Sequence, residues 1–150
     1  MAKLIGIAVR PEVDAAMVLM DQTIIREESG VDGDYRRGRG ARQVTVLFKD
    51  QWEAACRAVD TDLPWTTRRA NLLVDGMTLA DCKGLSLAIG DTILEVTGET
   101  LPCNLMEAAQ SGLRAALGPN WRGGVTCRVI QTGAVAVGDT VAVLETTTLI

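Results

Sequence analysis

Two segments of the sequence share one pattern, in which an apolar run is followed by a Gly-Asp pair and a second apolar run. They lie at residues 85–91 and 134–140, with Gly90-Asp91 and Gly138-Asp139 at the turns. This pattern is typical of a β-hairpin. Other short strands are expected at residues 3–10, 23–26, 42–48, 91–97, 125–130 and 141–145, and at the end of 64–76.

Helical spacing of apolar residues occurs in three places. One helix is expected to begin at Asp50, and a second to cover residues 105–117. Residues 11–20 show helical spacing as well, although a strand follows them at once. Many short strands with glycine turns and only two or three helices predict a mainly β (α+β) fold. We expect one domain over residues 1–150, a closed or nearly closed β-barrel with two or three short helices.

One of the four cysteines, Cys103, lies at the junction between the strand at 91–97 and the helix at 105–117, directly after Pro102. Backbone N–H groups and the positive end of the helix dipole at this position would favour a thiolate. A thiolate attacks electrophiles and binds soft metals. The alternative is a small buried apolar residue, which is the role expected for Cys56, Cys82 and Cys127.

The composition excludes several classes of function. A net charge of −4 and only five aromatic residues argue against nucleic acid as a partner. No apolar run approaches the roughly 20 residues of a membrane span, and the first ten residues look like a strand rather than a signal peptide. Four cysteines without paired spacing indicate reduced thiols in the cytoplasm. The absence of histidine rules out Ser-His and Cys-His nucleophile pairs and zinc sites that need imidazole.

Arginine is concentrated in two places, although the chain is acidic overall. Twelve arginines stand against three lysines, and arginine holds phosphate and carboxylate groups in a bidentate fork. Three arginines lie in a glycine-rich loop at 29–40, and an Arg68-Arg69 pair stands close to Asn71. The alternatives are a mobile loop with solvated charges and an ordinary exposed turn. The loop does not match the phosphate-binding pattern that ends in Gly-Lys-Ser/Thr, nor a GxGxxG pattern.

An ordered set of short motifs covers nearly the whole chain, and together it resembles a MOSC domain of the short, stand-alone bacterial type. The MOSC domain is the module at the C-terminus of molybdenum cofactor sulfurases. Each motif is weak alone, but the order and spacing of the set are specific. The motifs are Gly30-x-x-Gly33-Asp34, Arg42-Gln43-Val44-Thr45, Arg69-x-Asn71-Leu72, Leu87-x-Ile89-Gly90, Pro102-Cys103, Gly123-Gly124 and Gly138-Asp139.

The resemblance implies a barrel-like fold with Cys103 at its pocket as the reactive residue and as the candidate metal ligand. Molybdenum cofactor (molybdopterin) is the implied cofactor, and no pyridoxal-phosphate site is evident among the three lysines. The domains that accompany larger relatives, a pyridoxal-phosphate desulfurase, an N-terminal barrel extension and a ferredoxin domain, are not seen in the sequence. The residues implied to line an anionic ligand site are Gly33, Asp34, Arg42, Thr45, Arg69, Asn71, Gly123 and Gly124.

Three hypotheses follow for the function. The first is a molybdenum-cofactor-binding or sulfur-carrier domain, in which Cys103 carries a persulfide or binds molybdenum. The second is a molybdenum-cofactor-dependent reductase of N-hydroxylated compounds, which needs a separate electron donor protein. The third is a binding module without catalysis. The implied partner is a sulfur donor or acceptor protein, or an electron donor protein.

Overall fold

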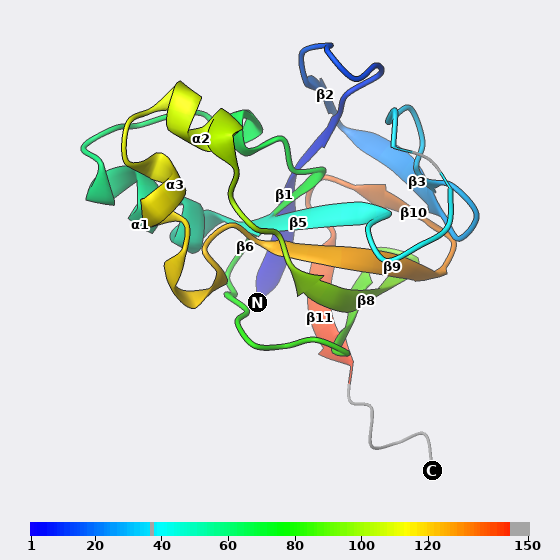
Figure 1. Cartoon of the computed structure of the whole chain (residues 1–150). Coiled ribbons are helices and arrows are strands. Elements are labelled where there is room, and N and C mark those ends of the chain that lie inside the picture. The colour runs from blue at the N-terminus through cyan, green and yellow to red at the C-terminus, as the bar shows by residue number, and fades with distance from the viewer. Residues whose placement is uncertain (37, 145–150) are drawn as a thin grey trace.

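A seven-stranded barrel forms the centre of the computed structural model, which describes residues 1–36 and 38–144 (Figure 1). Its strands are β1 (Ala2–Val9), β5 (Val44–Phe48), β6 (Leu72–Asp75), β7 (Ser86–Ile89), β8 (Thr92–Glu99), β9 (Val125–Gln131) and β11 (Thr140–Leu144). They follow the order β11-β7-β8-β9-β5-β6-β1, and pairing of β1 with β11 closes the ring. The predicted closed barrel is confirmed. Glu145, the last residue of the strand expected at 141–145, lies outside the described residues.

The remaining strands extend one side of the barrel. β2 (Val18–Met20) pairs with the end of β1, so residues 11–20 do not form the helix that their spacing suggested. Pairing with β1 satisfies the backbone of this segment, and Val18 stays half-exposed. β3 (Gln22–Arg26), β4 (Gly30–Val31) and β10 (Gly133–Ala136) form a second, three-stranded sheet in the order β10-β3-β4.

The two Gly-Asp pairs have different roles. Gly90-Asp91 is the turn of a hairpin, as predicted, because Ile89 pairs with Thr92. Gly138-Asp139 is not a hairpin turn, because β10 pairs with β3 whereas β11 pairs with β7 and β1. The Asp139 carboxylate accepts a hydrogen bond from the Ala136 N–H at 2.8 Å, and the Gly138 N–H donates to the Leu4 carbonyl at 2.7 Å. These contacts direct the chain from the small sheet into the barrel.

Three short helices cover one side of the barrel (Figure 1). They are α1 (Lys49–Ala58), α2 (Asn104–Ala109) and α3 (Leu113–Ala116), and two 3₁₀ turns accompany them, η1 (Trp65–Arg68) and η2 (Pro119–Trp121). The single helix predicted over 105–117 is wrong. Gly112 has a φ of 86°, which a right-handed helix cannot contain, so the segment is broken between α2 and α3. No helix in the described ranges is long and apolar enough to cross a membrane.

Alternating side chains of the central strands divide the core in two. On β5, Val46 and Phe48 point into the barrel, and Leu47 packs under the helices. β6 repeats this alternation, with Leu72 inside the barrel and Leu73 in the helical cluster. The helices are therefore fixed to the outer wall of the barrel, and the loops between wall and helices form the site described below.

The four cysteines differ in how deeply they are buried. Cys56 and Cys127 are buried, and Cys82 is half-buried against the barrel core, as expected for apolar packing residues. Burial raises the pKa of all three thiols, most strongly that of Cys127 inside the barrel. Cys103 is the exposed cysteine.

Candidate functional site

Cys103 caps the start of α2, four residues beyond the end of β8. Its backbone is extended (φ −129°, ψ −177°), and its carbonyl accepts a hydrogen bond from the Met106 N–H at 3.0 Å. The predicted strand-to-helix junction is therefore present. Because α2 has only six residues, its dipole is smaller than the sequence suggested.

A cavity of about 260 Å³ opens beside Cys103, between the helices and the glycine-rich loop. Of the residues implied by the sequence motifs, seven line it and two, Gly33 and Gly124, do not. The seven are Asp34, Arg42, Thr45, Arg69, Asn71, Cys103 and Gly123. The structure adds further side chains that the motifs did not identify, chiefly Arg10, Tyr35, Arg36, Arg68 and Thr100.

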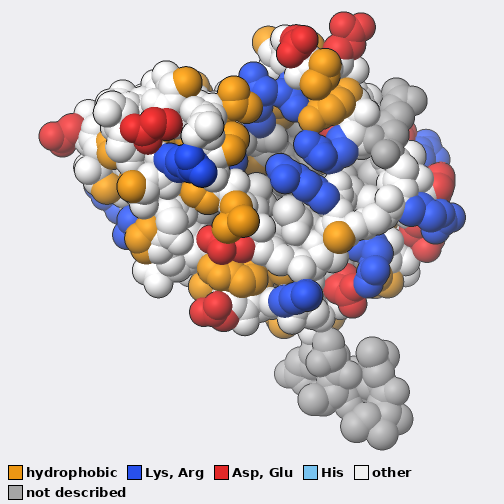
Figure 2. Space-filling view, in the orientation of Figure 1, with side chains coloured by type: hydrophobic (Ala, Val, Ile, Leu, Met, Phe, Trp, Pro, Cys, Tyr) orange, Lys and Arg blue, Asp and Glu red, His pale blue; other side chains and the backbone are white. Residues whose placement is uncertain are grey.

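The cavity wall is strongly cationic. Five arginines line it, together with one carboxylate, Asp34, which accepts hydrogen bonds from the backbone N–H groups of Arg10 at 2.9 Å and Arg36 at 3.3 Å. Figure 2 shows basic side chains gathered beside a hollow near the centre of this face, between the helices and the β3–β10 side. This local excess of arginine in an acidic protein favours the binding of an anion in the cavity.

Two of these arginines are held by one phenol. Arg10 and Arg36 each donate from Nη2 to the Tyr35 hydroxyl, at 2.7 and 2.9 Å, and the Arg10 guanidinium lies 4.5 Å from the centre of the Tyr35 ring. Cation–π contact and hydrogen bonding fix the two like charges side by side. Sequence spacing did not indicate this pair. Two backbone hydrogen bonds bring Arg10 to the loop: its N–H donates to the Asp34 carboxylate, and its carbonyl accepts from the Tyr35 N–H at 2.7 Å.

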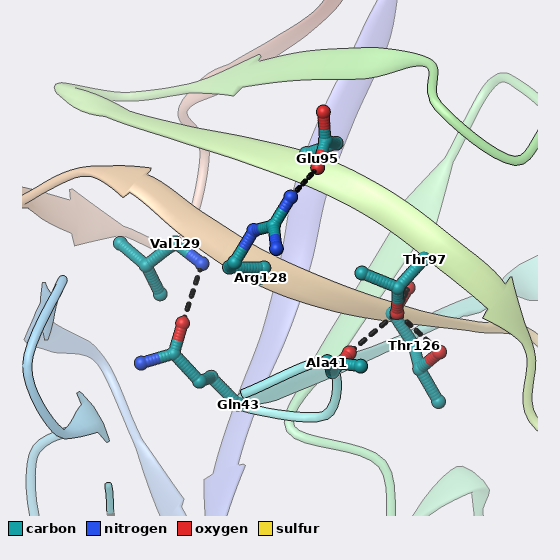
Figure 3. Close-up of polar contacts among 7 residues, drawn as sticks. All are labelled: Ala41, Gln43, Glu95, Thr97, Thr126, Arg128 and Val129. Atoms are coloured by element: carbon teal, nitrogen blue, oxygen red, sulfur yellow. Dashed lines mark hydrogen bonds and ion pairs between the residues drawn. The ribbon is translucent and has the colours of Figure 1, made fainter. Parts of the chain in front are cut away.

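The glycine-rich loop that carries Asp34 and Tyr35 is anchored at its return to β5. Gln43 is buried, and its amide donates to the carbonyls of Glu27 and Gly38 at 2.8 and 2.9 Å. Its Oε1 accepts from the Val129 N–H at 2.8 Å, and the Thr97 hydroxyl bonds the Ala41 carbonyl (Figure 3). The loop is thus tied to β8 and β9. Arg37, one of its three arginines, lies outside the described residues.

Arg68 is buried in the cavity wall, whereas Arg42 is exposed. Burial lowers the pKa of Arg68 to about 10, and it is the main cause of the lowered pKa of Arg42, to which the neighbouring charge of Arg36 adds. A thiolate at Cys103 would oppose both shifts. With a pKa of about 10, Arg68 is fully charged near neutral pH.

Thr45 and Asn71 reach the cavity wall, but their polar atoms bond within the sheet. Asn71 Oδ1 accepts from the Thr45 backbone N–H at 3.1 Å, and its Nδ2 donates to the Ala8 carbonyl at 3.3 Å. The Asn71 N–H in turn donates to Thr45 Oγ1 at 3.1 Å. These bonds join β5, β1 and the start of β6, so the two residues shape the wall on which the arginines stand.

The three glycines that the resemblance placed at the site, Gly33, Gly123 and Gly124, have different roles. A Cβ at Gly123 would overlap the Thr100 carbonyl and lie 2.9 Å from Arg68 Nη2. The absence of a side chain at Gly123 therefore leaves room for the Arg68 guanidinium group. A Cβ at Gly124 would overlap the Val46 carbonyl, and its φ of 91° suits glycine, so this residue serves the packing of β9 on β5. Gly33, with a φ of 90°, turns the loop before Asp34.

Arg69 adopts a left-handed backbone at the end of η1, with φ 63° and ψ 28°. Such a conformation costs a non-glycine residue about 1 kcal/mol. We therefore expect Arg69→Gly to be more stable than Arg69→Ala by about 1 kcal/mol, the reverse of the usual order of these two residues. Urea unfolding measures the difference. If Arg69→Ala is the more stable variant, the strain assigned to this position is wrong.

Comparison with known proteins supports the fold. A family model, MOSC domain, matches residues 33–142. No curated protein is similar enough in sequence to count as a match. The YuaD protein from Bacillus subtilis has a similar structure, with a TM-score of 0.80 at 19% identity over 95% of this chain and 96% of that one.

Two YiiM structures are similar as well. That from Geobacillus stearothermophilus gives a TM-score of 0.75 at 15% identity, over 97% of this chain and 76% of that one. That from Escherichia coli gives 0.70 at 16% identity, over 95% and 70%. At these identities the likeness establishes a shared fold.

Proposed function

Because this chain belongs to the MOSC domain family, which is associated with the molybdenum cofactor, we propose that its arginine-lined cavity binds that cofactor and that Cys103 is the reactive group. The observation that carries the proposal is the placement of the one exposed thiol in the same cavity as five arginines. The finer proposal is that Cys103 acts as a sulfur carrier or as a thiolate ligand to molybdenum.

The residues present fit such a ligand by their chemistry. Arg42, Arg68 and Arg69 supply charge-assisted donors for a phosphate group, and a thiolate is a soft donor suited to molybdenum. Thr100 adds a buried hydroxyl in the cavity wall with no hydrogen-bond partner among the described residues. When bound, the cofactor would supply oxidation–reduction chemistry, and the protein would hold and orient it.

Sulfur carriage by Cys103 needs no external oxidant when the donor is a persulfide. The Cys103 thiolate attacks the outer sulfur of the donor persulfide, so that a new S–S bond forms at Cys103 Sγ. The donor's S–S bond breaks, and its electron pair leaves with the donor as a thiolate. Five arginines line the cavity in which this step would take place. The partner in this proposal is a sulfur donor or acceptor protein.

We expect Cys103→Ser to abolish the modification of the natively purified protein. Intact mass and molybdenum content are measured after expression in a host that makes molybdenum cofactor. A mass increase of one sulfur atom that reduction removes, and that is absent from Cys103→Ser, supports sulfur carriage. Molybdenum that is bound by the wild type and lost from the variant supports cofactor binding. Cys82→Ser, which changes a half-buried thiol outside the cavity, is the matched control.

Two outcomes would contradict the proposal. Retention of both sulfur and molybdenum by Cys103→Ser would exclude Cys103 as the reactive group. A wild-type protein with neither signal, whose Cys103 reacts with iodoacetamide no faster than free cysteine, would favour a binding module without catalysis. Bound molybdenum together with reduction of an N-hydroxylated compound by an added electron donor would instead favour the reductase hypothesis.

A further inference from the structure

The planar guanidinium group of Arg68 has two edges with different surroundings. Along one edge, Nε donates to the Gly123 carbonyl at 3.2 Å, and Nη2 donates to the carbonyls of Thr100 and Leu101 at 2.8 and 3.3 Å. These bonds join the segment before Cys103 to the loop before β9. A guanidinium carries five N–H donors, and this edge uses three of them.

The other edge faces the cavity. Nη1 makes no hydrogen bond with any residue in the described ranges, yet it is not among the buried orphaned atoms, which are Thr23 Oγ1, Gln51 Oε1 and Thr100 Oγ1. Arg68 as a whole is only 7% exposed, and it lines the cavity. Two N–H donors of a buried cation are therefore open to whatever enters the cavity.

No carboxylate forms an ion pair with Arg68 in the part of the chain that the structure describes, and Glu99 acts on its charge only from a greater distance. The ion pairs there are Arg26–Asp32 and Arg128–Glu95, both away from the cavity. A buried guanidinium bonded only to neutral carbonyls loses hydration without gaining an ion-pair partner. An anion on Nη1 would supply the missing charge in a setting where water screens it weakly.

We propose that Arg68 binds an oxyanion through Nη1 and, through its opposite edge, holds Cys103 beside that oxyanion. The ligand class is a dianionic oxyanion, either inorganic phosphate or sulfate or the phosphate group of a larger molecule. The proposal rests on the proposed function for the identity of the site. It extends that function by making Arg68, rather than the other four arginines of the cavity, the primary anion contact.

Inorganic phosphate is the probe, and the shift of the unfolding temperature with phosphate concentration, at constant ionic strength, gives its affinity. Phosphate binding should also slow alkylation of Cys103 by iodoacetamide. We expect Arg68→Gln to weaken phosphate binding about 10- to 100-fold and to remove the protection of Cys103. Arg128→Gln, which removes a surface arginine of an ion pair remote from the cavity, should leave the phosphate affinity unchanged.

If Arg68 has only a structural role, a different result is expected. Arg68→Gln would then unfold at a lower temperature but bind phosphate with wild-type affinity, and this outcome overturns the proposal. If Arg68→Gln does not fold, Arg68→Lys is used instead, because lysine keeps the charge but cannot make the three hydrogen bonds to the carbonyls of Gly123, Thr100 and Leu101 in the same geometry. We expect it to retain phosphate binding within about tenfold, with a changed alkylation rate of Cys103. Wild-type affinity together with an unchanged alkylation rate in Arg68→Lys would overturn the proposal too.

The test separates this inference from the proposed function. Cys103→Ser keeps Arg68 and should bind phosphate as the wild type does, whatever sulfur or molybdenum it carries. If phosphate binds through Arg68 but neither sulfur nor molybdenum is found, only the proposed function fails. If phosphate does not stabilise the wild-type protein more than chloride does, the role of Arg68 fails alone. To separate free phosphate from a larger source, a phosphate monoester is compared with phosphate under the same conditions.

Discussion

Gly123→Ala is expected to lower the free energy of unfolding by about 3 kcal/mol and to weaken anion binding together with it. The added Cβ would overlap the Thr100 carbonyl and lie 2.9 Å from Arg68 Nη2. Both neighbours belong to the contact that ties the Cys103 segment to the loop before β9, so neither can move alone. Urea unfolding gives the stability, and the phosphate-dependent unfolding temperature gives the anion affinity.

Gly98→Ala is the matched control for this substitution. Gly98 lies on β8, where a Cβ would meet nothing closer than Thr126 Oγ1 at 3.8 Å and the backbone is not left-handed. The control should change the free energy of unfolding by less than about 0.5 kcal/mol. If Gly123→Ala is equally mild, or is destabilised without any loss of anion affinity, the passage of Arg68 beside Gly123 does not matter for the site.

Local patterns predicted the barrel because each strand carries its own signal. The strand expected at residues 42–48 and the Gly90-Asp91 turn both depend on only a few residues, and both were confirmed, the strand as Val44–Phe48. The Gly138-Asp139 pair failed as a hairpin because its outcome depends on Leu4 and Ala136, one of them far away in the chain. The helical spacing of residues 11–20 was misleading because residues 18–20 pair with β1 and residues 11–15 form turns and bends.

Sequence motifs identified some of the residues that line the cavity. The others could not be predicted, because tertiary contacts bring them to the cavity. Cys103 and Arg42 were marked by family spacing, and both line the cavity. Arg10 gave no signal, since a charged residue at the end of a strand is ordinary until the loop of Tyr35 closes over it. The Arg68-Arg69 pair was noted, but the sequence could not show that Arg68 is the buried member, because burial depends on the loops of Thr100 and Gly123.

The hydrogen bonds of Asn71 indicate a structural role that its motif alone did not show. Asn71→Ala is expected to lower the free energy of unfolding by about 2–4 kcal/mol. It removes the acceptor of the buried Thr45 N–H and the donor to the Ala8 carbonyl, and no water can easily replace them in a wall that is 5% exposed at Asn71. Urea unfolding measures the loss. Because the Asn71 amide is already bonded inside the sheet, we expect the variant, below its unfolding transition, to retain phosphate affinity within about threefold.

Asn104→Ala makes the same substitution at an exposed asparagine, whose Oδ1 accepts from Arg114 Nη1 at 2.6 Å. It should cost less than about 0.5 kcal/mol, because water replaces an exposed hydrogen bond at little cost. A large loss of stability in Asn71→Ala with unchanged phosphate affinity would identify Asn71 as a wall residue that positions the arginines. A large loss of phosphate affinity at unchanged stability would instead make Asn71 a direct ligand contact, as its motif implied. The pair of measurements thus separates the residues that build this cavity from those that bind in it.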